Sequence, residues 1–248
     1  MIELVRSELL KFRTTRGWWG YLAVIVLLAG LGTAADLGSA EEEQRGLVDY
    51  QRDLVEGIGV AALLGMVLGI TIITTEFRHG TITPTLLTEP RRERVVVSKA
   101  IAGVLVSLLF ALVALAILAA VAITWLSIVG ADIHATDEAV VRRIGQMLLF
   151  APLWTLLGIA IGSLIQNQVV ALVGTLIWLF LGETLLIGVF GLLDIDAAAD
   201  YLPFQALDAA DGTTDGLLSY WAGVGVALAW TAAIGAAGTE RIRRRDVT

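Results

Sequence analysis

The chain has 248 residues, of which 57% are hydrophobic, and its mean hydropathy is +0.80. Soluble domains are only about 45–50% apolar, so this composition argues against an ordinary soluble protein. The formal net charge is −7, and the complete absence of cysteine excludes disulfides and thiolate metal sites.

Six uninterrupted apolar runs follow one another along the chain. Each is about long enough to cross a hydrocarbon layer as a helix, which takes roughly 17–25 residues. An outer-membrane barrel would instead show alternating segments of about 10 residues. We therefore predict an all-α, polytopic membrane protein in which residues 1–248 form a single transmembrane domain. The predicted spans are residues 18–35, 58–75, 100–129, 144–165, 169–190 and 220–237.

Residues 1–17 are predicted to form an amphipathic helix that lies in the headgroup layer. Ile2, Val5, Leu9 and Phe12 fall on one helical face, and most of the basic residues of the segment fall off that face. A frayed basic tail is the alternative interpretation.

The first span begins with Trp18 and Trp19, which are typical of a membrane–water interface. Residues 33–35 would be a passable signal-peptide cleavage site. However, the segment before the span is long and contains Glu3 and Glu8, unlike a short basic leader. We therefore expect the span to be retained.

Glycines spaced four residues apart occur in two spans. Gly65 and Gly69 lie in the second span, and Gly158 and Gly162 lie in the fourth. This spacing lets helix backbones approach closely and can drive association. In a chain with 26 glycines it also arises by chance, so packing within the chain and a dimer face both remain open.

A polar stretch, residues 75–99, separates the second and third spans and contains eight charged residues. Pro84 and Pro90 each indicate the start of a helix, because proline suits the first helical turn. The first of these helices, residues 84–88, would be very short and would carry Leu86 and Leu87. A short helix with an apolar tip and charged flanks is well suited to bind a cytoplasmic protein.

Basic residues are concentrated on one predicted side of the membrane. Residues 1–17, 76–99 and 238–248 hold 13 of the 17 Lys and Arg residues, whereas residues 191–219 hold none. The positive-inside rule therefore places both termini and the loop of residues 76–99 in the cytoplasm, and residues 191–219 outside. Of the 24 acidic residues, 16 fall in the three outer loops.

Glu183 is the one clear ionisable residue deep within a span. A charge at that depth costs at least about 2.5–3.5 kcal/mol on insertion scales, so the side chain should face the bundle interior, a cavity or a partner, or be protonated. A structural hydrogen bond to a neighbouring helix and a role in transport are both open.

Catalytic motifs are absent from the sequence. A phosphate-binding loop needs lysine followed by Ser or Thr, but Lys11 precedes Phe12 and Lys99 precedes Ala100. The two histidines, His79 and His134, fall in different loops, and we expect no metal site. We predict that the chain itself is not an enzyme and has no catalytic residues.

The polar stretch resembles the signature of the permease subunits of ATP-binding-cassette (ABC) exporters of the type-2 class, bacterial branch. In that family the second span ends in Glu, and Gly-Thr, a short apolar helix, Pro, Arg and Lys follow before the third span. The matching residues here are Glu76, Gly80, Thr81, Leu86, Leu87, Pro90, Arg94 and Lys99. Residues 7–19 resemble the family's amphipathic N-terminal helix, and residues 201–212 resemble its segment before the last span.

The resemblance implies a multi-pass subunit of the plasma membrane that pairs with a second permease copy or a close relative around a translocation path. Two separate cytoplasmic ATPase subunits would bind ATP and Mg²⁺, so no cofactor is expected in this chain. They would dock on residues 76–99, the coupling loop, with Pro84 in its short helix, and no nucleic acid is expected as a partner.

Two alternatives come from other functional classes. A secondary transporter could place spans one to three and four to six as an inverted repeat, but only Glu183 could then carry a proton. A membrane anchor or assembly factor would instead work through its outer loops.

Overall fold

The computed structural model of the chain describes residues 1–15, 17–89, 91–212 and 218–244. Of the residues in these ranges, 87% are helical, and none of them lies in a strand. The elements are α1 (Ile2–Thr14), α2 (Gly17–Ser39), α3 (Glu42–Arg45), α4 (Val48–Leu54), η1 (Val55–Gly59), α5 (Val60–Arg78), α6 (Ile82–Thr88), α7 (Arg92–Val129), α8 (Glu138–Leu164), α9 (Gln168–Ile177), η2 (Trp178–Gly182), α10 (Glu183–Leu192), η3 (Asp196–Tyr201), α11 (Pro203–Asp211) and α12 (Tyr220–Arg243).

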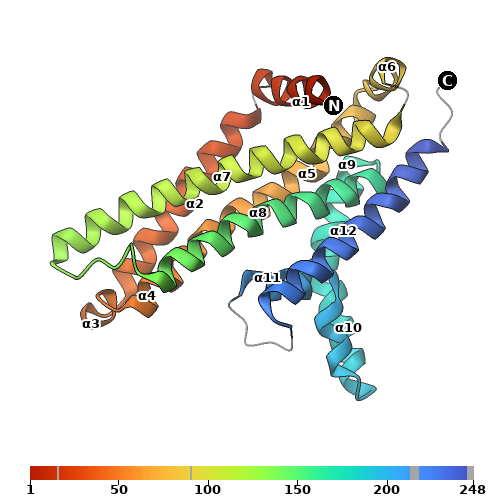
Figure 1. Ribbon diagram of the computed structural model, residues 1–248. Helices are drawn as coiled ribbons and strands as arrows, with labels where there is room; N and C mark the ends of the chain where they lie inside the picture. Colours follow the sequence, from red (N-terminus) through yellow and green to blue (C-terminus); the bar gives the residue numbers. More distant parts are fainter. Residues whose placement is uncertain (16, 90, 213–217, 245–248) are drawn as a thin grey trace.

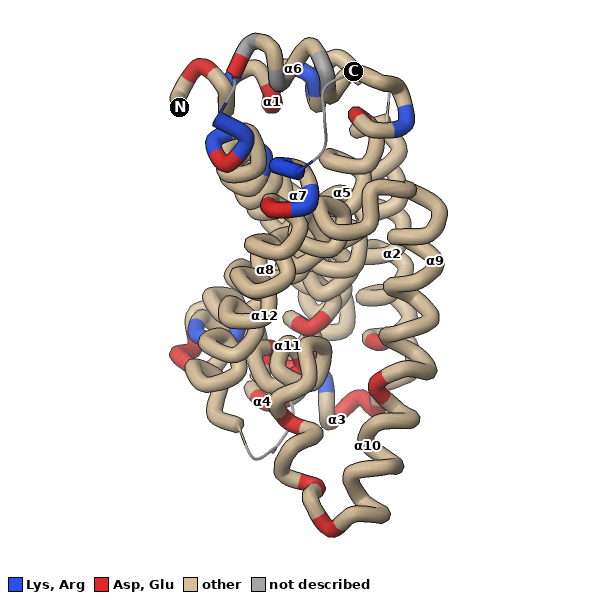
Figure 2. Tube along the Cα trace, turned by 90° about the vertical axis from the view of Figure 1, so that its right-hand side faces the viewer, with Lys and Arg blue, Asp and Glu red and all other residues tan. Residues whose placement is uncertain are grey.

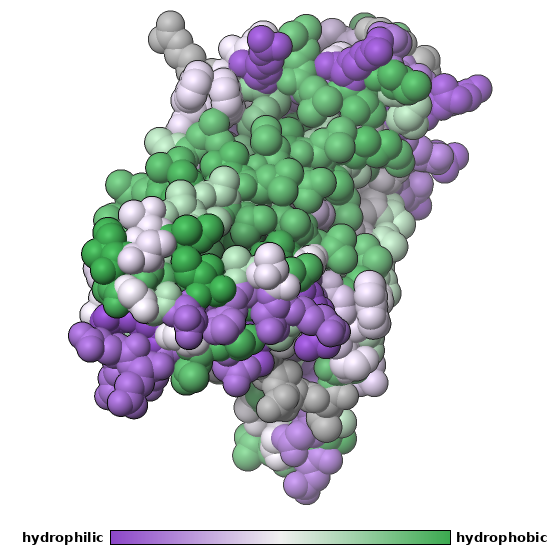
Figure 3. All heavy atoms as spheres, turned by 60° about the vertical axis from the view of Figure 1, so that its left-hand side comes forward, coloured by the Kyte–Doolittle hydropathy of each residue, from purple (hydrophilic) through white to green (hydrophobic). Residues whose placement is uncertain are grey.

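Six stretches within the described ranges are long and apolar enough to cross a membrane, as the sequence predicts. They are Gly17–Ser39, Val48–Arg78, Arg92–Val129, Glu138–Leu164, Gln168–Leu192 and Tyr220–Arg243. Figure 3 shows the result on one face of the molecule, where a broad apolar surface lies between polar ends. Most of the helices extend into the polar flanks beyond the predicted spans, because a helix satisfies its own backbone hydrogen bonds and need not end where the lipid ends.

The predicted coupling loop is much shorter in the structure than residues 76–99. Glu76 lies in the last turns of α5, and α7 already begins at Arg92, eight residues before the predicted third span. The charges of Glu76 and Lys99 did not end the helices because these residues are buried and ion-paired, as described below. Likewise, the predicted outer loop of residues 191–219 contains η3 and α11.

The bundle is organised around the contact between α5 and α8, with α7 and α12 packed against this pair and α2 packed mainly against α7 (Figure 1). The two helices touch backbone to backbone at the glycines that the sequence singles out. A Cβ on Gly69 would clash with the carbonyl oxygen of Thr155, and one on Gly158 would clash with that of Met66. A Cβ on Gly162 would lie 2.9 Å from the carbonyl oxygen of Ile70. These glycines are therefore used for packing within the chain.

The fifth span leaves the bundle part-way along its length. Its first part, α9, packs against α5 and α8, whereas α10 diverges from the other helices and contacts mainly η2 and η3 (Figure 1). The two parts meet at η2, a single π-helical turn over Trp178–Gly182. Such turns insert an extra residue into a helix and often occur at functional sites.

Most basic residues lie at one end of the molecule, and most acidic residues lie at the other. The end that carries α1, α6 and the last turn of α12 holds most of the Lys and Arg residues, and we call it the basic end (Figure 2). The opposite, acidic end carries α3, α4, η3 and α11 and is dominated by Asp and Glu. Among the described residues of the acidic end, Arg143 is the one buried cation. Its guanidinium group pairs with Glu56 and Asp211, each at 3.1 Å.

Candidate functional site

Four charged side chains from three helices meet at the basic end of the bundle. Glu8 and Lys11 come from α1, Glu76 from the end of α5 and Lys99 from α7. The Nζ atom of Lys99 lies 2.8 Å from both Glu8 Oε2 and Glu76 Oε1. The Nζ atom of Lys11 lies 2.7 Å from Glu8 Oε1 and 2.8 Å from Glu76 Oε1. Each ammonium group thus bridges both carboxylates, and we call this closed arrangement the ion ring.

The ion ring is largely removed from water. The side chain of Lys99 is 2% exposed and those of Glu8 and Glu76 are 9% exposed, while Lys11 is 48% exposed. Burying charges is costly unless each one is paired, and removing one partner of a buried pair is strongly destabilising. The ring therefore fixes the position of α1 against α5 and α7. These are the helices that precede and follow α6 in the chain.

The ring changes the protonation behaviour of its α1 members. Burial by itself would raise the pKa of Glu8, but the nearby ammonium groups of Lys99 and Lys11 outweigh it and hold that pKa below its ordinary value. Burial would likewise lower the pKa of Lys11, and its hydrogen bonds to Glu76 and Glu8 raise it instead. Both groups are therefore held in their charged forms.

The sequence-predicted residues between the two helices form a compact turn and a short helix. Gly80 has a φ of +69°, a left-handed conformation that favours glycine, where the chain leaves α5. Thr81 is the N-cap residue of α6, and its carbonyl accepts a hydrogen bond from Thr85 Oγ1 at 3.0 Å. The helix begins at Ile82, two residues before the predicted start at Pro84.

The short helix α6 presents an apolar side chain to the exterior at the basic end. Leu87 is 71% exposed there. The side chain of Leu86 lies outside the described part of the structure, as does Pro90 altogether. Arg94 does not join the ion ring, and it pairs instead with Glu89 at 3.7 Å on the surface.

Two members of the ion ring, Glu8 and Lys11, were not predicted as site residues. Their spacing of three residues on a helix, with opposite charges, is a recognisable signal for an ion pair. That signal normally indicates a solvated surface pair. Nothing in the local sequence shows that Lys99, 91 residues away from Glu8, completes the arrangement.

A cavity of about 590 Å³ adjoins the ion ring. It lies between α1, α2, α5, α6 and α7, and its walls include Phe12, Trp18 and Leu68 together with the ring members Lys11 and Glu76. Thr81, Pro84 and Thr85 also line it, so one face of α6 closes this cavity while Leu87 is exposed. A movement of α6 would therefore change the shape of the cavity next to the ion ring.

The carboxylate of Glu183 points into the interior of the protein and binds the N-terminal end of α11. It is 2% exposed, and its oxygens accept hydrogen bonds from the backbone N–H groups of Phe204 at 2.9 Å and Gln205 at 3.2 Å. These are among the first N–H groups of α11, which have no partner within their own helix. A carboxylate at such a position typically stabilises a helix by about 0.3–2 kcal/mol. Glu183 thereby joins the diverging fifth span to the segment before the sixth.

No group of three or more His, Asp or Glu side chains within the described ranges could hold a metal ion. The basic end thus combines a buried network of ion pairs with a short helix that carries an exposed leucine.

Comparison with known protein families shows to which family the chain belongs. A family model described as "ABC-2 family transporter protein" matches residues 4–182, which run from α1 through the first four spans and end with η2 in the middle of the fifth. The chain belongs to the ABC-2 transporter family. No curated protein matches the sequence.

Membership of the ABC-2 family makes the chain the membrane subunit of an ABC transporter, a multi-pass permease in a lipid bilayer. The matched region contains all four members of the ion ring and the whole of α6.

Proposed function

We propose that this ABC-2 permease is the transmembrane subunit of an ATP-driven exporter and that it couples to a separate ATPase through α6. The observation that carries the proposal is the placement of α6. It is a short helix with an exposed Leu87, held between two spans whose ends are fixed to each other by the ion ring. A force applied to α6 by an ATPase would be transmitted to α5 and α7, because short connections join α6 to both helices and the ion pair between Glu76 and Lys99 joins these helices to each other.

The ATPase partner would bind and hydrolyse ATP. The sequence has no GxxxxGK[ST] loop, so ATP and Mg²⁺ would be bound by the partner, and hydrolysis there would drive alternating access of the permease to the two sides of the membrane. The transported compound would leave the cytoplasm.

A second permease copy would complete the translocation path. The outward-diverging half of the fifth span carries exposed Phe180, Leu181 and Leu185, and α10 has few neighbours within the chain. We place the second copy against this half of the span, where it would cover these exposed apolar side chains.

The proposal requires the basic end to face the cytoplasm, as the positive-inside rule predicts. Single cysteines replacing Ser39 at the end of α2 and His79 after α5 should report this directly, because the chain has no cysteine of its own and both positions are exposed. We expect Ser39→Cys to react with a membrane-impermeant maleimide added to intact cells, and His79→Cys to react only after the cells are opened. Labelling of His79→Cys in intact cells would reverse the orientation and contradict coupling through α6.

The coupling role of α6 is tested by Leu87→Asp. Truncating a central apolar anchor of an interface commonly costs about 2 kcal/mol or more, so binding of the ATPase should weaken by roughly 30-fold or more. The measurement is co-purification of an ABC ATPase subunit from the same genome, co-expressed with the permease, together with the ATPase activity of the purified complex. The matched control is Leu47→Asp, which places the same charge at an exposed leucine at the acidic end. Equal ATPase recovery with both variants would show that α6 is only a connector.

A further inference from the structure

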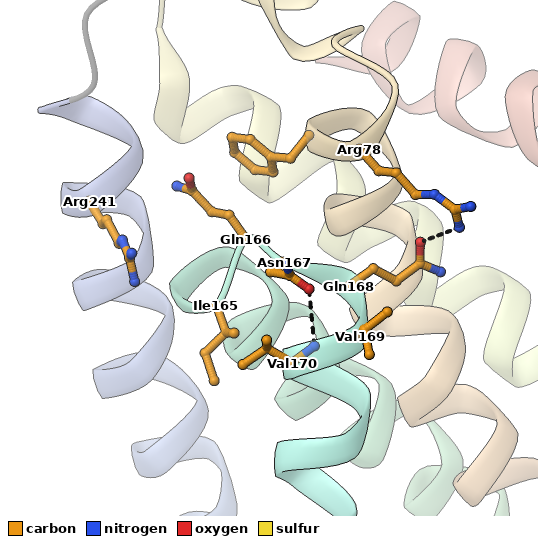
Figure 4. Close-up of a pocket in the computed structure, with 9 residues that line it drawn as sticks. Arg78, Ile165, Gln166, Asn167, Gln168, Val169, Val170 and Arg241 are labelled. Carbon is orange, nitrogen blue, oxygen red and sulfur yellow. Dashed lines mark hydrogen bonds between the residues drawn. The ribbon is translucent and has the colours of Figure 1, made fainter.

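A second cavity, of about 740 Å³, opens at the basic end on the side of the bundle where the fifth span begins. Its walls come from the end of α5, the connection between α8 and α9, and the last turns of α12. It is lined by Phe77, Arg78, residues 165–170 and Arg241. Figure 4 shows Arg78 and Arg241 on opposite sides of this connection.

The lining of this cavity carries positive charge without a compensating carboxylate. Its two ionisable residues are Arg78 and Arg241, and its other polar side chains are carboxamides. Arg78 donates to Gln168 Oε1 at 3.3 Å, and Arg241 donates to the carbonyl of Leu164 at 2.7 Å. Neither guanidinium forms an ion pair with a carboxylate that the structure describes. Each guanidinium has five N–H donors, so both keep donors for an anionic ligand.

An apolar surface continues from the cavity along the membrane-spanning part of α9. Val169 and Val170 line the cavity and are exposed, and Val173 is exposed one turn further into the span. A cationic recess at the headgroup level with an apolar track leading into the hydrocarbon layer matches a molecule that has an anionic head and acyl chains.

We propose that this cavity binds an anionic phospholipid of the leaflet at the basic end. Arg78 and Arg241 would hold the phosphate-bearing headgroup, and an acyl chain would lie along Val169, Val170 and Val173. Basic pockets between transmembrane helices are known to hold anionic headgroups in this way. The apolar track favours a lipid over an acidic protein segment, because a protein outside the membrane does not reach the hydrocarbon layer. The proposal is independent of ATPase coupling.

The test uses the purified full-length chain, stripped of co-purified lipid in detergent and titrated with single lipids under native mass spectrometry. We expect phosphatidylglycerol and cardiolipin to bind at least about tenfold more tightly than phosphatidylcholine, since each basic residue near a headgroup contributes roughly fivefold. Arg78→Gln combined with Arg241→Gln should abolish that preference. Arg78→Lys combined with Arg241→Lys, which retains both charges, should keep most of it.

The matched control is Arg94→Gln combined with Arg244→Gln, which removes two exposed charges from the same end but outside the cavity. This variant should retain the wild-type preference, and unfolding temperatures will show whether each variant is folded. An equal loss in the control would reduce the effect to general surface charge and overturn the site. Displacement of the phospholipid by free glycerol phosphate at the same concentration would overturn the role of the acyl chains. Unchanged lipid binding together with weaker ATPase recovery in the Gln variant would assign the cavity to the protein partner instead.

Discussion

Replacing Lys99 by methionine should lower the free energy of unfolding by about 3–5 kcal/mol, the usual cost of removing one partner from a buried ion pair. The substitution leaves the buried carboxylates of Glu8 and Glu76 facing each other with only the half-exposed Lys11 between them. Because the methionine is nearly as large as the lysine, a cavity would contribute little to the loss. The measurement is chemical unfolding of the purified permease in detergent micelles.

The control for this prediction is Arg94→Met, on the same helix. Arg94 pairs with Glu89 at 3.7 Å with its side chain 45% exposed, and such pairs contribute only about 0–1 kcal/mol. Similar losses for the two variants would show that the ion ring behaves as an ordinary surface network.

The stability of the permease at acid pH provides a second test of the ion ring. Since the pKa of Glu8 is lower in the folded chain than its ordinary value of 4.5, its contribution to stability is present above pH 4.5. That contribution should disappear as the pH falls through the lowered pKa, and Lys99→Met should show less of this acid-dependent loss than the wild type.

Gly158→Ala should separate the two central helices and cost about 1–3 kcal/mol, the range observed for overpacking a well-packed core. The added Cβ would collide with the backbone carbonyl of Met66 on α5, and a backbone atom cannot rotate away as a side chain can. The loss should appear as a lower unfolding midpoint in detergent, and Gly158→Leu should cost more because its side chain is larger.

Gly145→Ala is the matched control in the same helix, since an added Cβ there meets no atom within 4 Å. We expect it to be neutral or to stabilise by up to about 1 kcal/mol, because alanine is the better helix former. If both substitutions destabilise equally, the close approach of α5 and α8 is not what makes Gly158 necessary.

The sequence by itself determined the fold class and the number of spans. Each span is recognisable from its own residues, because the hydrocarbon layer requires about 20 consecutive apolar residues whatever the neighbouring helices do. A short helix was predicted over residues 84–88, since proline marks a helix start locally, and the helix observed there is Ile82–Thr88. The basic and acidic ends of the bundle followed from the positions of the charges along the chain.

Only the tertiary structure decided which polar residues meet. Glu76 and Lys99 were expected in an aqueous loop because charge was taken to mark the end of a span, but partners on α1 allow both to be buried within helices. Glu183 was recognisable as a carboxylate within a span, but only the fold shows that its partners are the backbone N–H groups of Phe204 and Gln205 in α11. Hydropathy depends on one residue and its neighbours in the chain. An ion pair across 91 residues depends instead on the position and rotation of two whole helices, which packing alone sets.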